Sequence, residues 1–171
     1  GSDVEFILPL RERIRQGATR GPVIVAAGPI LDAAPPDWPL RRHVENAGQA
    51  REAVRSLGLA GVDFIKVHDN TPRDAFFAIA QESARLGLPF AGHVPAAVSV
   101  DEAAAAGIAS IEHLANSRVY LECSGGEPYV LSRCRAPFER LAARGVWQTP
   151  TFAFFQALPA MLSGGSPPHA E

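Results

Sequence analysis

Apolar and polar positions follow a recurring order along the chain. An amphipathic stretch with apolar residues at helical spacing leads to a glycine, and a short apolar run follows. The stretch that contains Phe76, Phe77 and Ile79 shows this spacing clearly, because these side chains would share one side of a helix. The apolar runs that we expect to form strands are 22–27, 62–67, 88–93, 108–114 and 146–151.

The ends of the amphipathic stretches carry the local signals of helices. Capping-box-like starts occur at Asn46-x-x-Gln49, Thr71-x-x-Asp74 and Ser99-x-x-Glu102. Glycines placed to end helices in a left-handed conformation are Gly61, Gly87, Gly107 and Gly145. A further helix is expected over residues 4–16. Strands that alternate with helices predict an α/β protein with a parallel sheet of about five strands.

Two segments interrupt this order. Gly28–Arg42 contains several prolines, and Tyr120–Ser132 contains two adjacent glycines and a proline, so we expect both to be long loops. Long loops at one end of a parallel sheet are typically functional. We expect residues 1–162 to form a single domain, and the Gly/Pro/Ser-rich residues 163–171 to be a disordered tail.

Composition excludes some classes of function. The 171 residues carry a formal net charge of only −2, which argues against nucleic acid or an anionic membrane as partner. No apolar run approaches the roughly 18 residues of a membrane span. The start lacks the pattern of a signal peptide, yet neither a cytoplasmic nor a periplasmic location is favoured. Cys123 and Cys134 are too few for a disulfide framework, which leaves a single bridge or free thiols as alternatives.

The candidate chemistry lies at three strand ends. Lys66, His93 and His113 each end an otherwise apolar run, on three consecutive expected strands. In parallel α/β folds the carboxyl ends of the strands build the site, so the three side chains should meet in one crevice. A single buried lysine or histidine at such a place is more often structural. Three in consecutive units favour a functional site.

These residue types suit a divalent metal. Imidazole nitrogens are good ligands for zinc and related ions. A lysine ammonium has no free lone pair, so Lys66 would become a ligand only as a carbamate, formed from the neutral amine and carbon dioxide. We therefore expect Lys66, His93 and His113 to bind a divalent metal, with zinc as the leading candidate.

Neighbouring residues have weaker claims. His68 lies two residues after Lys66, so it should share that face of the sheet and could contact a substrate. Thr149 ends the last expected strand and is a second candidate for substrate binding. Glu112 precedes His113 directly, and alternation predicts that it points away from the crevice, towards the helices.

These motifs together resemble the amidohydrolase superfamily, in its imidazolonepropionase- and prolidase-like branch. The runs that carry the resemblance are 61–67, Gly92-His93-Val94-Pro95, 107–113 and 147–151, which are similar to barrel strands four to seven. The resemblance implies a partial (β/α)8 TIM-type barrel, roughly strands three to seven. It also implies a metal-dependent hydrolase of C–N bonds in small amides, cyclic amides or dipeptides, with carbamylated Lys66 bridging two metals and His93 and His113 holding one of them.

The sequence also departs from the family pattern. It contains no His-x-His pair, which holds the first metal in the family, and the aspartate of the eighth strand is missing. We therefore assign no catalytic residue and expect this chain alone to be a truncated, inactive fragment. An open arc of strands with an apolar inner face should self-associate through its sheet edges.

Two other functions remain open at this stage. Lys66 could act as the nucleophile of a Schiff-base lyase or aldolase. Borohydride would then trap the substrate on Lys66, and chelators would not affect the activity. Alternatively the three polar residues could fill a crevice in a non-catalytic domain.

Overall fold

The computed structural model describes residues 1–34, 40–113, 119, 123 and 131–151. Most of the expected loop at Tyr120–Ser132 and all of the expected tail at 163–171 lie outside the described residues, so these two predictions remain predictions. Cys123 and Cys134 form a disulfide bond, which decides between the two alternatives for the cysteines.

The described strands form one parallel sheet with helices between them. The strands are β1 (Ile30–Asp32), β2 (Arg41–His43), β3 (Ile65–Val67), β4 (Phe90–Gly92), β5 (Ser110–Glu112) and β6 (Trp147–Thr149). The helices are α1 (Val4–Arg15), α2 (Ala47–Ala60), α3 (Arg73–Leu86), α4 (Val100–Ala105) and α6 (Leu131–Ala143). The strand order is β2-β1-β3-β4-β5-β6, and every neighbouring pair is parallel.

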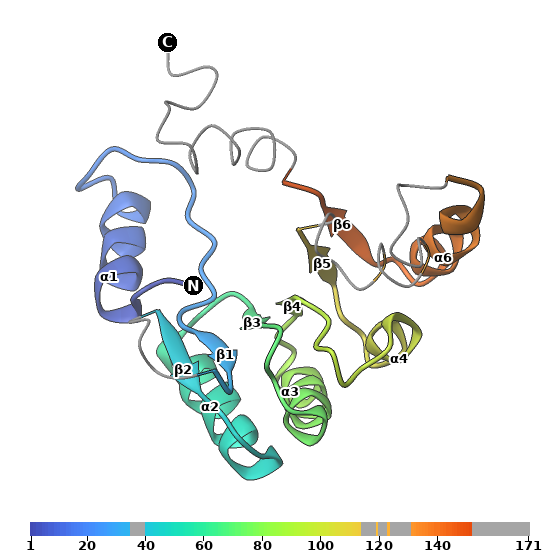
Figure 1. Ribbon diagram of the computed structural model, residues 1–171. Helices are drawn as coiled ribbons and strands as arrows, with labels where there is room; N and C mark the ends of the chain where they lie inside the picture. The colour runs from blue at the N-terminus through green and yellow to red at the C-terminus, as the bar shows by residue number, and fades with distance from the viewer. Residues whose placement is uncertain (35–39, 114–118, 120–122, 124–130, 152–171) are drawn as a thin grey trace, which may run out of the picture.

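This arrangement is an unclosed part of a barrel. The row of strands curves, and α2, α3, α4 and α6 all lie on its convex side (Figure 1). The strands β2 and β6 lie at the two ends of the row and do not meet. The predicted α/β class with a parallel, barrel-like sheet is therefore confirmed.

Two predictions about the first strands are wrong. Residues 22–27 form no strand, and the side chain of Val23 is 93% exposed. The segment Gly28–Arg42 is not simply a loop, because it contains β1 and the first two residues of β2. Both strands have only three residues, so the prolines do not interrupt them: β1 lies between Pro29 and Pro35, and β2 begins after Pro39. The number of prolines in the segment suggested a loop, but their positions leave room for two short strands.

The helix signals are correct at two of the three capping motifs. Asn46 caps α2 by accepting from the backbone N–H of Gln49, and Ser99 and Glu102 form a full capping box on α4. Thr71 does not cap α3, which begins after Pro72 without a side-chain cap. The Thr71 hydroxyl instead lies within hydrogen-bond distance of the carbonyl oxygens of Leu31 and His68.

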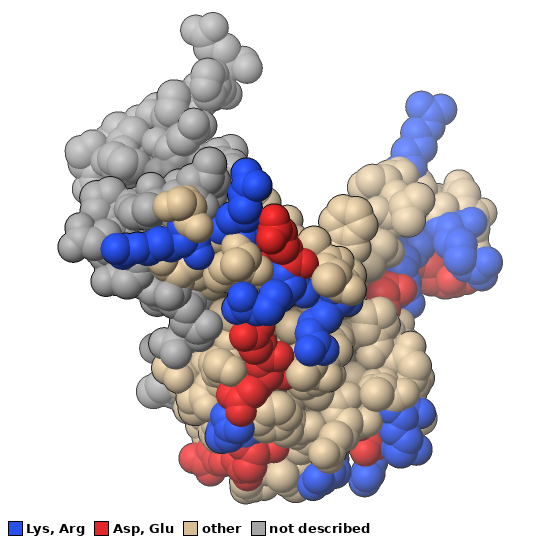
Figure 2. All heavy atoms as spheres, turned by 90° about the vertical axis from the view of Figure 1, so that its right-hand side faces the viewer, with Lys and Arg blue, Asp and Glu red and all other residues tan. Residues whose placement is uncertain are grey.

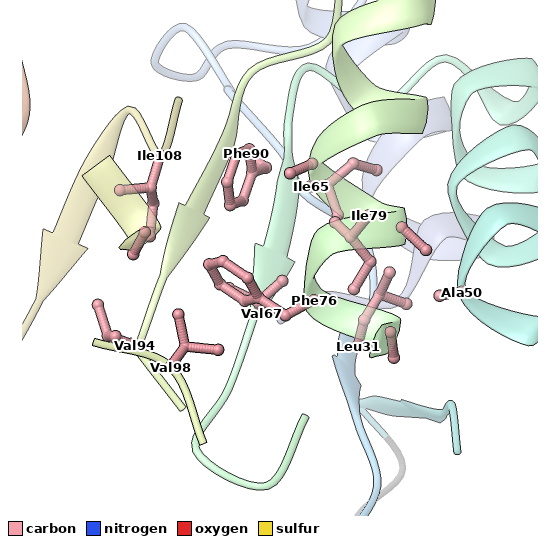
Figure 3. Close-up of a cluster of buried hydrophobic side chains, with 14 of the residues drawn as sticks. Leu31, Ala50, Ile65, Val67, Phe76, Ile79, Phe90, Val94, Val98 and Ile108 are labelled. Atoms are coloured by element: carbon pink, nitrogen blue, oxygen red, sulfur yellow. The ribbon is translucent and has the colours of Figure 1, made fainter. Parts of the chain in front are cut away.

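The hydrophobic core lies between the convex face of the sheet and the helices. Outward-pointing strand residues such as Leu31, Val67 and Phe90 pack against α2 and α3 (Figure 3). Phe76 of α3 is fully buried at the centre, and its ring meets the ring of Phe90 edge-on at 5.6 Å. Burial of these side chains is the main favourable contribution to the stability of the fold.

The concave face of the sheet is mixed, and not uniformly apolar as expected: Lys66, Ser110 and Glu112 share it with Ala91 and Trp147. Parallel neighbours in register share a face, so Lys66 lies beside Ala91, which lies beside Ser110. Glu112 lies two residues beyond Ser110 and therefore on the same face. The surface of the molecule is mixed in charge: acidic and basic side chains are interspersed over the face shown in Figure 2. Among the described helices, none combines the length and the apolar character that a membrane crossing requires.

Candidate metal centre

The three residues predicted from the strand ends lie at one edge of the concave face. Lys66 is the middle residue of β3, and His93 and His113 directly follow β4 and β5. The rings of His93 and His113 meet edge-on with their centroids 4.9 Å apart. His68, predicted to contact substrate, stacks on His93 at 4.1 Å. The parallel register thus brings these histidines, which are far apart in the sequence, into one cluster.

His93 has one ring nitrogen engaged and the other free. Its Nδ1 lies 2.9 Å from a carboxylate oxygen of Asp69, in the segment that follows β3. Its Nε2 is buried and makes no hydrogen bond within the part of the chain that the structure describes. The hydrogen bond to His93 lowers the pKa of Asp69, so this carboxylate is ionised at neutral pH. A buried imidazole nitrogen without a partner is the arrangement expected of a metal ligand.

Gly92 allows the backbone to place His93 there. Its φ is +131°, and a Cβ at this position would lie 2.2 Å from the carbonyl oxygen of Val67. The end of β4 therefore approaches the end of β3 more closely than any other residue would permit. The backbone N–H of His93 donates to the same carbonyl of Val67, which fixes the start of the segment after β4.

His113 reaches the cluster through an unusual backbone conformation. Its φ is +61°, in the left-handed region that non-glycine residues rarely adopt. Its Nδ1 lies 3.0 Å from the hydroxyl of Thr151, whose φ is also positive. Burial of the ring is the main cause that lowers the pKa of His113, and the electrostatic influence of His93 and of the Lys66 ammonium lowers it further. The ring is therefore neutral near pH 7, as a metal ligand must be.

Glu112 faces the site, which corrects the prediction that it points towards the helices. Its Oε2 lies 2.6 Å from Nζ of Lys66, and both side chains are mostly buried. The prediction assumed regular alternation through His113. The left-handed turn at His113 breaks that alternation, so Glu112 and His113 both reach the concave side.

A second polar group that the sequence did not predict lies beside the cluster. Asp32, at the end of β1, is completely buried, and its Oδ2 lies 3.2 Å from Nε of Arg41 and 3.5 Å from Nδ1 of His68. Burial raises the pKa of Asp32, but His68, Asn70 and Arg41 outweigh it and hold that pKa below its ordinary value. The signal was present, since Asp32 follows the apolar pair Ile30-Leu31 much as Lys66 follows Phe64-Ile65.

Thr149 lies at the end of β6 and remains a prediction as a substrate contact. Its side chain is exposed, and its hydroxyl lies 3.2 Å from that of Ser110. Its backbone carbonyl accepts from the N–H of His113 at 2.8 Å, which ties the end of β6 to the cluster.

The cluster fits a divalent metal in its histidines. The neutral ring of His113 and the free Nε2 of His93 are suitable donors, and the centroids of the two rings lie 4.9 Å apart. His68, Asp69 and His93 also offer ligand atoms that all lie within 4.8 Å of one another. Lys66 fits less simply, because its amine donates to Glu112, whereas a carbamate would be an anion beside that carboxylate.

Comparison with known proteins gives a clear result for the fold. The sequence matches no protein-family model, and no curated protein is significantly similar to it. Solved structures do match. Bottromycin amidohydrolase is 25% identical with a TM-score of 0.67, covering 88% of this chain and 34% of that one.

Two further structures carry the same fold at lower identity. A Xaa-Pro dipeptidase with bound methionine in its active site is 21% identical, with a TM-score of 0.64 over 94% of this chain and 43% of that one. An ochratoxinase from A. niger is 18% identical, with a TM-score of 0.64 over 90% and 41%. The predicted resemblance to amidohydrolase-type structures is therefore confirmed. This chain spans less than half of the length of each of these three structures.

Proposed function

We propose that this chain forms part of a metal-dependent hydrolase that cleaves C–N bonds in small molecules, such as amides, cyclic amides or dipeptides. Amidohydrolases and a dipeptidase among the similar structures support the reaction class. The arrangement at the strand ends supports the metal. We propose that His93 and His113 hold one divalent ion, with zinc as the leading candidate and Lys66 as the third ligand.

The observation that carries this proposal is the free Nε2 of His93. It is buried and makes no hydrogen bond to any residue that the structure describes, while Nδ1 of the same ring is held by Asp69. An unpaired buried nitrogen costs about 1–3 kcal/mol, so a partner is expected. The neutral ring of His113, 4.9 Å away between centroids, offers the second nitrogen for the same ion.

The residues around the histidines would bind the substrate and hold the segment that carries His68 in place. When bound, the metal would lower the pKa of a coordinated water and polarise the scissile carbonyl. His68 lies over the ring of His93, where it is placed to contact the substrate. Asp32 accepts from the backbone N–H of Asn70, which holds the segment with His68 and Asp69 against β1.

Lys66 could not bind a metal in the arrangement described, because its side chain is an ammonium group hydrogen-bonded to Glu112. Carbamylation requires the neutral amine, and so does attack on a carbonyl to form a Schiff base. Lys66 would become a ligand only if it loses this hydrogen bond and its amine reacts with carbon dioxide to form a carbamate. We favour the hydrolase over the Schiff-base function because amidohydrolases and a dipeptidase are among the similar structures.

Metal content is the first test. We expect about one zinc per chain after incubation with zinc and bicarbonate, measured by elemental analysis after removal of unbound metal. The His93→Ala/His113→Ala variant should bind none. His43→Ala is the matched control, because His43 belongs to edge strand β2 and pairs with Glu45. An equal metal content in the double variant would contradict the proposed site.

Hydrolysis and assembly are separate measurements. Because the sequence lacks the His-x-His pair and the eighth-strand aspartate of the resemblance, we propose metal binding without turnover for these 171 residues. We also propose self-association through the strand edges of β2 and β6. Turnover of dipeptides by the purified chain, or a strictly monomeric sedimentation profile, would contradict the respective proposal.

A further inference from the structure

We propose that the disulfide between Cys123 and Cys134 is a redox-sensitive clasp for one end of the sheet. While the bond is formed, it holds α6 and β6 in place and thereby keeps His113 at the metal centre. Its reduction opens this end of the fold. The effect on metal binding rests on the proposed function, whereas the effect on α6 and β6 is a property of the protein without metal.

Helix α6 has few apolar contacts of its own. Among its described side chains only Cys134 and Leu141 are buried, and Phe138, on the same face, is partly buried. By contrast, α3 buries seven side chains. The ion pair of Arg140 with Asp101 of α4 is more than half exposed and contributes little. The hydrophobic contact that holds α6 is therefore small, and Cys134 supplies an important part of it.

The disulfide compensates for this small contact. Cys134 is completely buried and Cys123 is only 7% exposed. Their bond joins two points of the chain that are 11 residues apart, so it removes many of the conformations in which α6 has left the sheet. After reduction these conformations become accessible, and only the small apolar face of α6 opposes them.

Strand β6 depends on α6 for its position. It lies at one end of the strand order, so β5 is its only strand neighbour within the part of the chain that the structure describes. The helix leads into β6 through Gly145, whose φ of +70° ends the helical turn, and through Val146, which is buried. A displacement of α6 therefore also displaces β6.

Strand β6 and the residues after it in turn hold His113. The backbone carbonyl of Thr149 accepts from the N–H of His113 at 2.8 Å, and the hydroxyl of Thr151 lies 3.0 Å from Nδ1 of its ring. His113 has a left-handed backbone conformation, which a non-glycine residue keeps only where its surroundings enforce it. Direct contacts therefore connect the disulfide, through α6 and β6, with the metal centre.

The switching reaction is a two-electron reduction by a dithiol such as dithiothreitol. A thiolate of the reagent attacks one sulfur, which breaks the S–S bond and releases the other cysteine as a thiol. The second thiol of the reagent then displaces the first cysteine from the mixed disulfide. The protein gains two thiols, and the reagent becomes a cyclic disulfide. A reducing cytosol would keep the clasp open, so the closed form is the form of an oxidising compartment.

Amide hydrogen exchange measures the opening residue by residue. We would compare the oxidised protein with the protein reduced by dithiothreitol, both in EDTA, by NMR. The amides of Trp147 and His113, which join β6 to the β5 segment, should exchange on the order of 100-fold faster after reduction. The amide of Ile65, which joins β3 to the start of β4, should change little.

A variant without thiols is the control for the reagent. In Cys123→Ala/Cys134→Ala the same amides should exchange fast with and without dithiothreitol, because these are the only two cysteines of the chain. The variant also allows zinc affinity to be measured without direct binding of zinc by free cysteines. By chelator competition, it should bind zinc about 5–150-fold more weakly than the oxidised native protein. Arg135→Ala, at an exposed position of α6, should leave the affinity unchanged.

Three results would overturn the inference. One is unchanged exchange at Trp147 and His113 after reduction. Another is an equal acceleration at Ile65, which would make the disulfide a support of the whole fold. The third is native zinc affinity in the variant without cysteines. The expected pattern of exchange in a protein that binds no zinc would instead refute the proposed function and leave the clasp intact.

Discussion

The two faces of the same strands have opposite chemistry. On the convex face, Ile65 and Val67 are fully buried against the helices. On the concave face, Lys66, between them, pairs with Glu112 across two strands. One residue of offset along β3 therefore separates the hydrophobic core from the candidate site. The core stabilises the fold, and the polar face is free to carry chemistry because stability does not depend on its being apolar.

The two faces also differ in how their groups are satisfied. Apolar side chains on the convex face need only close packing, which many combinations of residues provide. Buried charges on the concave face each need a particular partner, as Asp32 has in Arg41 and Lys66 has in Glu112. Substitutions should therefore have large, local effects on the convex face and strongly coupled effects on the concave face.

The largest effect is expected from the convex face. Phe76→Ala removes a completely buried ring from the centre of the core and should lower the free energy of unfolding by about 3–5 kcal/mol. Urea denaturation of the metal-free protein measures it. Phe6→Ala is the control, since Phe6 is 68% exposed and should change stability by no more than about 0.5 kcal/mol. Equal losses in the two variants would show that the core is not where the packing places it.

A smaller but coupled effect is expected from the concave face. Lys66→Met and Glu112→Leu should each cost about 1–3 kcal/mol, because each leaves a mostly buried partner unpaired. The double variant should cost less than the sum of the two.

This double-mutant cycle, measured in EDTA, has a matched comparison in Arg140 and Asp101. These two side chains form an ion pair while 53% and 59% exposed, so their coupling should lie between about 0 and 1 kcal/mol. Additive losses at Lys66 and Glu112 would argue that their contact is absent in solution.

The smallest effect is a pH dependence outside the sheet, where α2 meets α3. Hydrogen bonds from Arg85 and Arg55 lower the pKa of Glu82 from 4.5 to about 2. Its stabilising contribution is therefore complete above about pH 4.5 and is lost as the pH falls towards 2. Glu82→Gln should be less stable than the native protein at pH 7, and this difference should shrink at pH 3.

Glu52→Gln, an exposed carboxylate on α2, is the control for that experiment. The free energies of unfolding of the three proteins at the two pH values decide the matter. A difference between native protein and Glu82→Gln that stays constant from pH 7 to pH 3 would contradict the role given to the two arginines.

Much of the fold followed from local patterns. The capping motifs at Asn46 and Ser99 and the left-handed glycines at Gly61 and Gly87 depend on residues within a few positions of one another, so they could be identified directly. The strands β1 and β2 could not be identified in this way. Three-residue strands have too little periodicity of their own, and their pairing with each other defines them.

The sequence predicted the three central residues of the candidate site but not the hydrogen bonds and ion pairs that position them. Lys66, His93 and His113 stood out as polar ends of apolar runs, and the structure places them at one edge of the sheet. Asp32 and Asp69 were missed, because their roles depend on partners 36 and 24 residues away, at His68 and His93 respectively.

The sequence by itself determined the alternation of helices and strands and the polar residues that end the strands, because these depend on short-range periodicity and on the intrinsic properties of side chains. Only the tertiary structure decided that Glu112 faces Lys66 and that Asp69 holds His93. Both contacts depend on the register between neighbouring strands and on backbone turns at Gly92 and His113. Such contacts have no local signature, because the energy that forms them arises between residues that only the folded chain brings together.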